Sequence, residues 1–276
     1  MATRLAVLGS PIAHSQSPAL HAAAYGVLGL GWDYSAIDVA EPALREFVEG
    51  LGPDWRGLSL TMPLKREVLG LLDSVDPVAT LTGGANTVLL AGGERHGFNT
   101  DVYGITRAFR EAGIDSLSKV RILGGGATAA SVLVAVQQLG ARHITLSLRT
   151  PSKAAALAAL AETLGLDLQV DPLGATPGAG VTYDAIVSTL PGGASQQLEF
   201  SSDLRHTAVL FDVAYSPWPS VFAEQWLDVR GTVISGMEML INQALAQVRI
   251  FVGGDADAAL PEEARVLAAM RAAVGA

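Results

Sequence analysis

A glycine-rich segment near the middle of the chain has the spacing of a loop that binds a dinucleotide. Residues 124–129 read Gly-Gly-Gly-Ala-Thr-Ala, which fits the pattern G-x-G-x-x-A, and they follow the predicted buried strand that ends at 120–123. Glycine lets the backbone approach a pyrophosphate closely, and N–H groups at a helix start face its negative charge. The pattern therefore predicts a dinucleotide site formed by Gly124, Gly125, Gly126, Ala127, Thr128 and Ala129. A plain tight turn is the alternative that the motif by itself leaves open.

The end of the next predicted strand carries positive charge, where an NAD-binding chain usually has a carboxylate. Residues 129–161 contain no Asp or Glu, and Arg149, Thr150 and Lys153 stand at this position. A guanidinium can bind a 2′-phosphate through two hydrogen bonds, whereas NAD brings no charge for it to meet. We therefore expect NADP as the cofactor. The alternative is that both cations are solvated residues at a helix start.

Two further charged residues could take part in proton transfer. Lys65 follows the predicted buried strand 57–61, at the edge where open α/β sheets bind ligands. It could also be an ordinary lysine in the first turn of a helix. Asp101 precedes a predicted helix at 102–111, and aspartate is a favoured N-cap. Position alone leaves both interpretations open.

The elements that must position these residues alternate between strands and helices. In the first hundred residues we predict strands at 5–8, 32–39 and 57–61, helices at 18–28 and 42–51, and an edge hairpin formed by 86–90 and 94–98. A second series has helices at 102–111, 127–139 and 152–164 and strands at 119–123, 143–148, 184–188, 209–213 and 232–234, with a loop at 171–180. This order favours mainly parallel sheets flanked by helices.

We therefore predict an α/β protein with two domains. Residues 1–100 form an N-terminal α/β substrate-binding and catalytic domain with a mainly parallel sheet, and residues 101–235 form a Rossmann-type NADP-binding domain. Residues 236–276 form helices, because their apolar positions recur at helical spacing. We expect these helices to pack back on the substrate domain.

Composition narrows the classes of function. Half of the 276 residues are hydrophobic and 16% are charged, which is typical of a globular chain. The chain has no cysteine, which excludes disulfides, thiolate metal sites and a cysteine nucleophile. The five histidines lack metal-ligand spacing, so we expect no metal. A reducing, cytoplasmic compartment is consistent with this composition.

Charge and hydropathy limit the partners. The formal net charge is −9 and no basic run occurs, so we expect no binding to nucleic acid. Residues 122–141 carry no charge and could cross a bilayer by length. They contain three consecutive glycines, however, and we interpret them as a strand, a turn and a packed helix. We expect a small-molecule substrate, no membrane, and a monomer or homodimer.

Taken together, seven ordered segments resemble the shikimate dehydrogenase family over nearly the full length of the chain. They are residues 9–18 with paired serines, 59–65 with Lys65, 84–87, 99–101 with Asp101, the glycine motif, 212–217 and 236–244. The resemblance implies reversible reduction of 3-dehydroshikimate to shikimate with NADPH, a step in the biosynthesis of chorismate and the aromatic amino acids.

The resemblance also implies roles for individual residues. Lys65 and Asp101 form the catalytic pair, and Lys65 would supply a proton as hydride reaches the carbonyl carbon. The substrate-binding residues are Ser15 and Ser17 at the ring carboxylate, Thr61, Asn86 and Gln243 at hydroxyls, and Tyr215 at the carboxylate end. Ser188, Thr189 and Gly236 are assigned to the cofactor cleft.

Several of these residues also have a structural explanation. Ser17 precedes a proline in the manner of an N-cap. Asn86 could satisfy backbone groups of a turn, Gln243 could line a helix, and Tyr215 could pack within a turn.

Two departures from the family pattern concern the cofactor. Leu148 stands where the family commonly has asparagine, and Ser188 and Thr189 replace an asparagine-containing segment. Two alternative functions remain: a quinate/shikimate dehydrogenase that uses NAD, and a catalytically silent nucleotide-binding regulator of the same fold.

Overall fold

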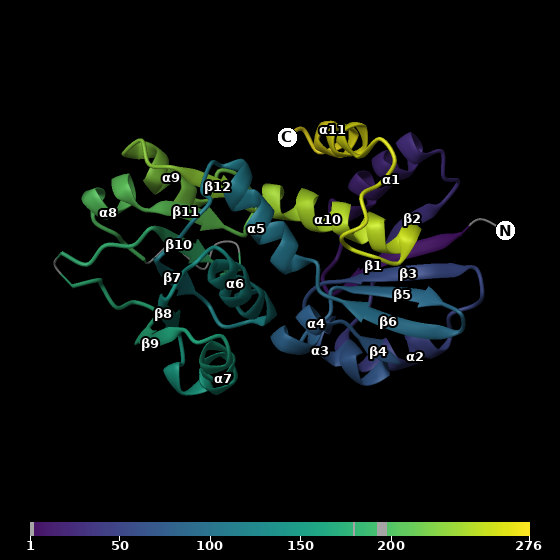
Figure 1. Ribbon diagram of the computed structural model, residues 1–276, viewed down its shortest axis with the longest axis horizontal. Coiled ribbons are helices and arrows are strands. Elements are labelled where there is room, and N and C mark those ends of the chain that lie inside the picture. Colours follow the sequence, from purple (N-terminus) through teal and green to yellow (C-terminus); the bar gives the residue numbers. More distant parts are fainter. Residues whose placement is uncertain (1–2, 179, 192–197) are drawn as a thin grey trace. The chain divides into compact units, whose positions relative to one another are not determined.

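The computed structural model describes residues 3–178, 180–191 and 198–276. The chain divides into two compact units (Figure 1). Unit 1 contains Met1–Gly104 and Leu240–Ala276, and unit 2 contains Ile105–Met239. Two helices, α5 (Asp101–Glu111) and α10 (Gly236–Gly253), contribute residues to both units.

Unit 1 is built on a six-stranded mixed sheet with the order β2-β1-β3-β5-β6-β4. The strands are β1 (Arg4–Gly9), β2 (Asp33–Asp38), β3 (Trp55–Leu60), β4 (Ser74–Val75), β5 (Thr87–Ala91) and β6 (Glu94–Phe98). Strand β1 pairs in parallel with β2 and β3, and β5 runs antiparallel to both β3 and β6. The predicted hairpin is therefore confirmed, but its place at the sheet edge is not, because β4 pairs outside β6. A two-residue strand has too short a pattern to be recognised in sequence.

Helices cover both faces of this sheet. One face packs against α2 (Leu44–Glu49), α3 (Leu64–Glu67), the 3₁₀ helix at Val68–Leu71 and α4 (Pro77–Thr82) through a core that includes Leu8, Leu58 and Leu60. The predicted helix at 42–51 is thus shorter than expected, since a 3₁₀ turn occupies Glu41–Ala43.

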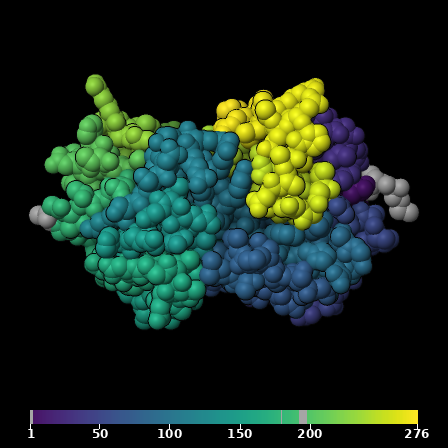
Figure 2. Space-filling model, viewed as in Figure 1, coloured from purple at the N-terminus to yellow at the C-terminus, as the bar shows by residue number. Residues whose placement is uncertain are grey.

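The opposite face carries α1 (Ser17–Leu28), α10 and α11 (Glu263–Ala273). Helix α10 passes so close to β3 that a Cβ on Gly57 would lie within 2.4 Å of the Phe251 ring, so glycine is required there. Helix α11 packs on α1, and the C-terminal helices form one surface of unit 1 (yellow in Figure 2).

Unit 2 is built on a second six-stranded sheet, with the order β12-β11-β10-β7-β8-β9. Its strands are β7 (Lys119–Leu123), β8 (His143–Leu148), β9 (Asp167–Pro172), β10 (Ala185–Ser188), β11 (Val209–Asp212) and β12 (Val233–Ser235), and all pairings are parallel. The chain direction across the sheet reverses between β7 and β10. Open α/β sheets bind ligands outside the carboxyl ends of strands at such a point.

The remaining helices of unit 2 are α6 (Ala127–Gln138), α7 (Ala155–Thr163), α8 (Ser202–Thr207) and α9 (Val221–Asp228), with a 3₁₀ turn at Pro151–Lys153. Aromatic side chains dominate one core, where Trp226 packs against Phe200 and Phe222. The two sheets confirm the predicted α/β class. The expected loop at 171–180 is wrong at its start, because β9 continues to Pro172 and pairs with β8.

The apolar segment 122–141 forms the end of β7, a glycine turn and the whole of α6. Across residues 3–178, 180–191 and 198–276, no helix combines the length and apolar character needed to traverse a bilayer. Within the same residues, no group of three or more His, Asp or Glu side chains is arranged to hold a metal ion.

A buried histidine gives unit 1 a pH-dependent stability. His21 of α1 stacks on Tyr34 of β2, with ring centroids 3.9 Å apart. Burial lowers the pKa of His21 from 6.5 to about 3. The folded chain thus keeps this ring neutral, while the unfolded chain protonates it below pH 6.5. Unfolding takes up a proton in this range, so stability falls as the pH drops from 6.5 towards 3, by at most about 1.4 kcal/mol per pH unit.

We expect His21→Gln to be less stable than the wild type at pH 7, and the difference to shrink by about 1 kcal/mol per pH unit below pH 6. Urea unfolding at pH 7, 6 and 5 measures this difference. His14→Gln removes an exposed imidazole of the same unit and reports any pH dependence that is not due to burial. A His21 difference that stays constant from pH 7 to 5 would contradict the prediction.

Candidate active site

Lys65 lies just beyond the carboxyl end of β3. Residues Thr61 to Pro63 connect the strand to the short helix α3, in which Lys65 is the second residue. The Leu64 N–H donates to the Thr61 carbonyl at 2.8 Å, and the Ala85 N–H donates to the Lys65 carbonyl at 2.8 Å. The backbone on both sides of the lysine is therefore held in place, and its side chain is only 13% exposed.

Asp101 meets Lys65 at this edge of the sheet. The Lys65 Nζ donates to Asp101 Oδ2 at 2.5 Å, and the carboxylate is 4% exposed. Asp101 does not cap α5, because it is itself the first residue of the helix and its N–H donates to Asn99 Oδ1 at 3.0 Å. The capping interpretation is therefore wrong, and the Asp101 carboxylate is left for the lysine.

Asn86 holds the second oxygen of this carboxylate. Its Nδ2 donates to Asp101 Oδ1 at 2.8 Å, to Thr100 Oγ1 at 2.9 Å and to Gln243 Oε1 at 3.3 Å. Its Oδ1 accepts from the Thr100 N–H at 2.9 Å. A backbone N–H can only donate, so this contact requires the carbonyl of the Asn86 amide to face Thr100 and its NH₂ to face Asp101. Lys65, Asp101, Asn86 and Gln243 are thus brought into one hydrogen-bonded group.

The serine loop lies next to the same strand end. A Cβ on Gly9 would lie 2.4 Å from Thr61 Cγ2, and the Ser10 N–H donates to the Met62 carbonyl at 3.1 Å. Ser15 Oγ accepts from the Ser17 N–H at 3.3 Å. Ser17 is the first residue of α1 and Gln16 occupies the N-cap position, so Ser17 is not the cap that its sequence position suggested. Hydroxyls of Ser15, Ser17 and Thr61 belong to loops and termini at this edge of unit 1.

Tyr215 belongs to unit 2 and is half-buried in the loop after β11. Burial raises the pKa of its phenol. The loop is held by Asp212, whose carboxylate accepts from the Ala214 N–H at 3.2 Å and from Ser220 Oγ at 2.6 Å. Burial also raises the pKa of Asp212. A role of Tyr215 at the substrate carboxylate stays a prediction.

The glycine motif forms a turn between β7 and α6 that leaves space for a ligand. Gly124 has φ +106°, a conformation that favours glycine, and a Cβ there would lie 2.5 Å from Thr189 Oγ1. A Cβ on Gly125 would lie 2.7 Å from Leu148 Cδ2, while nothing lies within 4 Å of that position at Gly126. Gly126 is the N-cap of α6 and supplies no side-chain cap. The turn therefore presents backbone N–H groups at an open helix start, which fits a pyrophosphate.

The other predicted cofactor residues follow the carboxyl ends of neighbouring strands. Ser188, at the end of β10, is aligned with Asp212 of β11, which is aligned with Ser235 of β12. Gly236 comes next, and a Cβ on it would lie 2.0 Å from the Val213 carbonyl oxygen. Glycine is therefore required there for the backbones to pass each other. Thr189 Oγ1 donates to the Leu123 carbonyl at 2.9 Å.

Arg149, Thr150 and Lys153 are exposed at the end of β8, after the buried Leu148. Thr128 is half-buried in the first turn of α6 and Ala129 is buried. An exposed guanidinium one strand away from the glycine turn is placed to meet an anionic group on a bound nucleotide.

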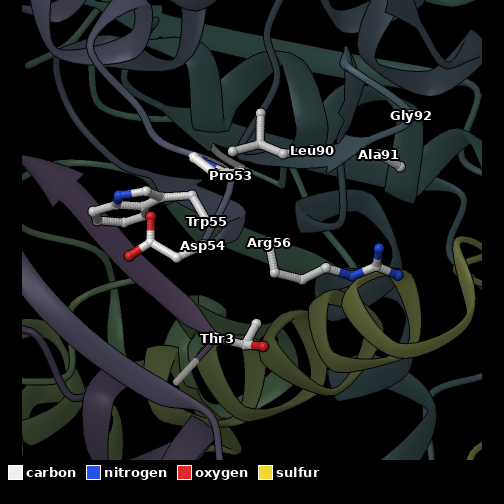
Figure 3. A pocket seen from close by; sticks show the side chains of 8 residues that line it. All are labelled: Thr3, Pro53, Asp54, Trp55, Arg56, Leu90, Ala91 and Gly92. Carbon is white, nitrogen blue, oxygen red and sulfur yellow. The ribbon is translucent and has the colours of Figure 1, made fainter. Parts of the chain in front are cut away.

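A pocket of about 490 Å³ lies elsewhere in unit 1, lined by Thr3, Pro53, Asp54, Trp55, Arg56, Leu90, Ala91 and Gly92 (Figure 3). It lies at the amino end of β3 and beside the turn after β5. Of its lining residues, Arg56 donates from Nε to the Phe251 carbonyl at 2.8 Å. Ligand sites of open α/β sheets lie at the carboxyl ends of strands, so this pocket is not the candidate site.

Comparisons with known proteins place the chain in a family. A family model described as the shikimate dehydrogenase substrate binding domain matches residues 7–88. A shikimate dehydrogenase (NADP(+)) from Methanothermobacter thermautotrophicus is 32% identical over 265 residues, which cover 94% of each chain. This chain belongs to the shikimate dehydrogenase family. The resemblance noted in the sequence is therefore confirmed.

Solved structures of other shikimate dehydrogenases agree. That of the Mycobacterium tuberculosis enzyme covers 98% of this chain and 99% of its own, with 35% identity and a TM-score of 0.85. That of shikimate 5-dehydrogenase from Thermus thermophilus, in complex with NADP(H) and shikimate, covers 99% of this chain and 100% of its own, with 32% identity and a TM-score of 0.81.

The structure of this shikimate dehydrogenase family member adds polar residues that the sequence analysis did not select. Thr100 and Thr87 bond to Asn86, and Asn99 holds the start of α5. Gln247 is buried one helical turn after Gln243. The sequence does contain a signal for Gln247. It lies four residues after Gln243 on the apolar face of a helix, and a buried glutamine requires polar partners in the interior.

Proposed function

We propose that this chain is an NADP-dependent shikimate dehydrogenase, which reversibly reduces 3-dehydroshikimate to shikimate in chorismate and aromatic amino acid biosynthesis. The observation that carries the proposal is the sheltered contact of Lys65 with Asp101, at 2.5 Å, beside the amides of Asn86 and Gln243. An ammonium next to neutral hydrogen-bonding groups is suited to a small polyhydroxylated acid that undergoes proton transfer.

NADPH, when bound, supplies the hydride for reduction of the substrate carbonyl carbon. Lys65 donates a proton from Nζ to the carbonyl oxygen as negative charge develops there, and accepts it back in the reverse direction. Asp101 keeps the lysine oriented and charged until transfer. Asn86 donates to the other carboxylate oxygen, so the Asp101 side chain cannot rotate away from the lysine without losing a hydrogen bond.

The polar residues at the carboxyl edge of unit 1 bind the substrate. Ser15 and Ser17 donate to the ring carboxylate, and Thr61, Asn86 and Gln243 contact ring hydroxyls. Tyr215, in the loop after β11, is assigned to the carboxylate end of the substrate. The protein carries a net charge of −9, so an anionic substrate is attracted by local donors and by Lys65, not by the overall field.

Unit 2 binds the cofactor. The residues of the glycine turn hold the pyrophosphate through backbone N–H groups, and Arg149, Thr150 and Lys153 meet the 2′-phosphate. Ser188, Thr189 and Gly236 line the cofactor cleft, and the backbone at Gly236 passes close to Val213. On this basis residues 1–100 form the substrate domain, 101–235 the cofactor domain and 236–276 the returning helices. The protein acts in the cytoplasm as a monomer or homodimer.

An assay with two cofactors and two substrates tests the function. With shikimate, we expect NADP to be reduced much faster than NAD, and with NADP we expect shikimate to be oxidised much faster than quinate. Nicotinamide absorbance measures all four combinations. Equal rates with quinate and NAD would favour the quinate/shikimate alternative, and no turnover in any combination would favour a silent regulator.

Substitution of the catalytic lysine tests the mechanism. Lys65→Ala should lower kcat by roughly 10²- to 10⁴-fold, because a positioned acid–base group contributes in this range. Arg66→Ala, an exposed neighbour in the same helix, serves as the control and should retain turnover. Near-normal kcat in a folded Lys65→Ala protein would remove this lysine from the mechanism.

Substitution of Arg149 tests the cofactor contact. Arg149→Ala should raise the KM for NADP at least about 10-fold and leave the KM for NAD nearly unchanged, because only NADP carries the 2′-phosphate. Arg142→Ala changes an exposed arginine just before the opposite end of β8 and should affect neither cofactor. An equal loss for NADP and NAD in Arg149→Ala would show that this contact does not exist.

A further inference from the structure

Gln247 of α10 is a buried amide whose hydrogen-bonding positions are all used. It is 2% exposed, and its Nε2 donates to the Asn86 carbonyl at 3.1 Å and to Thr87 Oγ1 at 3.0 Å. Its Oε1 accepts from Ser59 Oγ at 2.9 Å and from His21 Nε2 at 3.2 Å. An amide has two donor positions and two acceptor positions, so this side chain has a partner for each of them.

The direction of these bonds is determined by one backbone carbonyl. The Asn86 carbonyl can only accept, so the NH₂ of Gln247 must face it and the amide oxygen must face His21. His21 then donates through Nε2–H, and its Nδ1 accepts from the Tyr25 hydroxyl at 3.1 Å. The Ser59 hydroxyl donates to Gln247 Oε1 and accepts from the Tyr34 hydroxyl at 2.7 Å. The groups of α1, β2 and β3 thus hold Gln247 in one orientation.

The NH₂ group of Gln247 connects this network, through Thr87 and Asn86, to the Lys65–Asp101 pair. Because the Gln247 NH₂ donates to Thr87 Oγ1, the Thr87 hydroxyl directs its proton to Asn86 Oδ1, at 2.9 Å. This bond gives Asn86 Oδ1 a second donor beside the Thr100 N–H, and so reinforces the orientation that the backbone already requires. The NH₂ of Asn86 is therefore directed at Asp101 Oδ1, at 2.8 Å. The Gln247 amide therefore sets the direction of the Thr87 hydroxyl, and Thr87 and the Thr100 N–H together hold the Asn86 amide.

We propose that Gln247 is a positioning residue for the Lys65–Asp101 pair, acting through Thr87 and the Asn86 amide without contact with substrate or cofactor. The inference rests on the proposed function for its kinetic effect. The hydrogen-bond order itself is a property of unit 1, and it is measurable without turnover.

Gln247→Met keeps the volume of the side chain and removes its hydrogen bonds. We expect kcat with shikimate to fall by about 10-fold or more. The KM for NADP should stay within about twofold, because the predicted cofactor residues lie on other elements, apart from Gly236 at the far start of α10. Gln137→Met, which removes a half-buried glutamine from α6, is the matched control and should retain kcat. Thermal melting at the assay pH verifies that each variant is folded. If Gln247→Met does not fold, Thr87→Val replaces it, because valine removes the hydroxyl that links Gln247 to Asn86.

Gln247→Glu separates positioning from general stability. One carboxylate oxygen of the variant still accepts from Ser59 and His21. The other oxygen replaces the NH₂ group and faces the Asn86 carbonyl, which is also an acceptor. Protonation of the carboxylate gives that oxygen a hydrogen to donate. Burial raises the pKa of a carboxyl, so we expect the ratio of variant to wild-type kcat to rise as the pH falls from 9 to 6. In the wild type, the titratable neighbours do not change charge in this range, because burial lowers the pKa of His21 to about 3 and raises those of Tyr25 and Tyr34.

Amide hydrogen exchange of the Asn86 side chain, followed by ¹⁵N NMR, decides the inference without reference to activity. We expect slow exchange in the wild type and exchange at least about 10-fold faster in Gln247→Met, since the relay that orients the NH₂ is lost. Unchanged exchange together with kcat within twofold of the wild type would overturn the proposal, as would a Gln247→Glu ratio that is the same at every pH. A wild-type protein without shikimate-dependent NADP reduction would instead overturn the proposed function, and the exchange measurement would still test the positioning role.

Discussion

A lysine ammonium and an aspartate carboxylate held 2.5 Å apart, with side chains only 13% and 4% exposed, set the requirement that the rest of unit 1 meets. Removing two charges from water is costly, and their attraction compensates only if the geometry is good and the remaining lone pairs are bonded. Asn86 supplies the bond that the ion pair lacks, at Asp101 Oδ1. The surrounding polar residues are neutral, so they orient the pair without altering its net charge. This arrangement keeps an ammonium group, which can donate a proton, at the edge of unit 1 where we propose that the substrate binds.

The two units place their functional residues at the same kind of sheet edge but use that edge differently. In both units, functional residues lie at the edge of the sheet where parallel strands end, and in unit 1 the antiparallel β5 begins at that same edge. Unit 1 fills this edge with side chains, such as Thr61 after β3 and Asn86 before β5. Unit 2 instead removes side chains, because a Cβ at Gly124 or Gly236 would collide with Thr189 or Val213. Side chains give selectivity for a small acid, whereas bare backbone gives the close approach that a pyrophosphate needs.

The sequence predicted most elements because their patterns are local. The apolar runs of β7 and β8, the glycine turn between β7 and α6, and the exposed cations after β8 are all visible without a structure. Strand β9 was not predicted at all, since its last residues, Asp171 and Pro172, are typical of loops and its pairing depends on β8. The edge strand β4 was missed because two residues carry no periodicity. Both strands form because a neighbouring strand pairs with them, and not because their residues have a high intrinsic preference for β structure.

The amino-acid sequence by itself determined the α/β class, the dinucleotide turn and the family, because each depends on residue types within short segments. Only the tertiary structure decided which polar groups meet. Lys65 and Asp101 are 36 residues apart, and Gln247 reaches Asn86 across 161 residues. It also decided the direction of each hydrogen bond, since the backbone N–H of Thr100 and the carbonyl of Asn86 dictate how the two amides must face. Spacing encodes periodicity along the chain, but the orientation of a buried amide depends on donors and acceptors that only packing brings together.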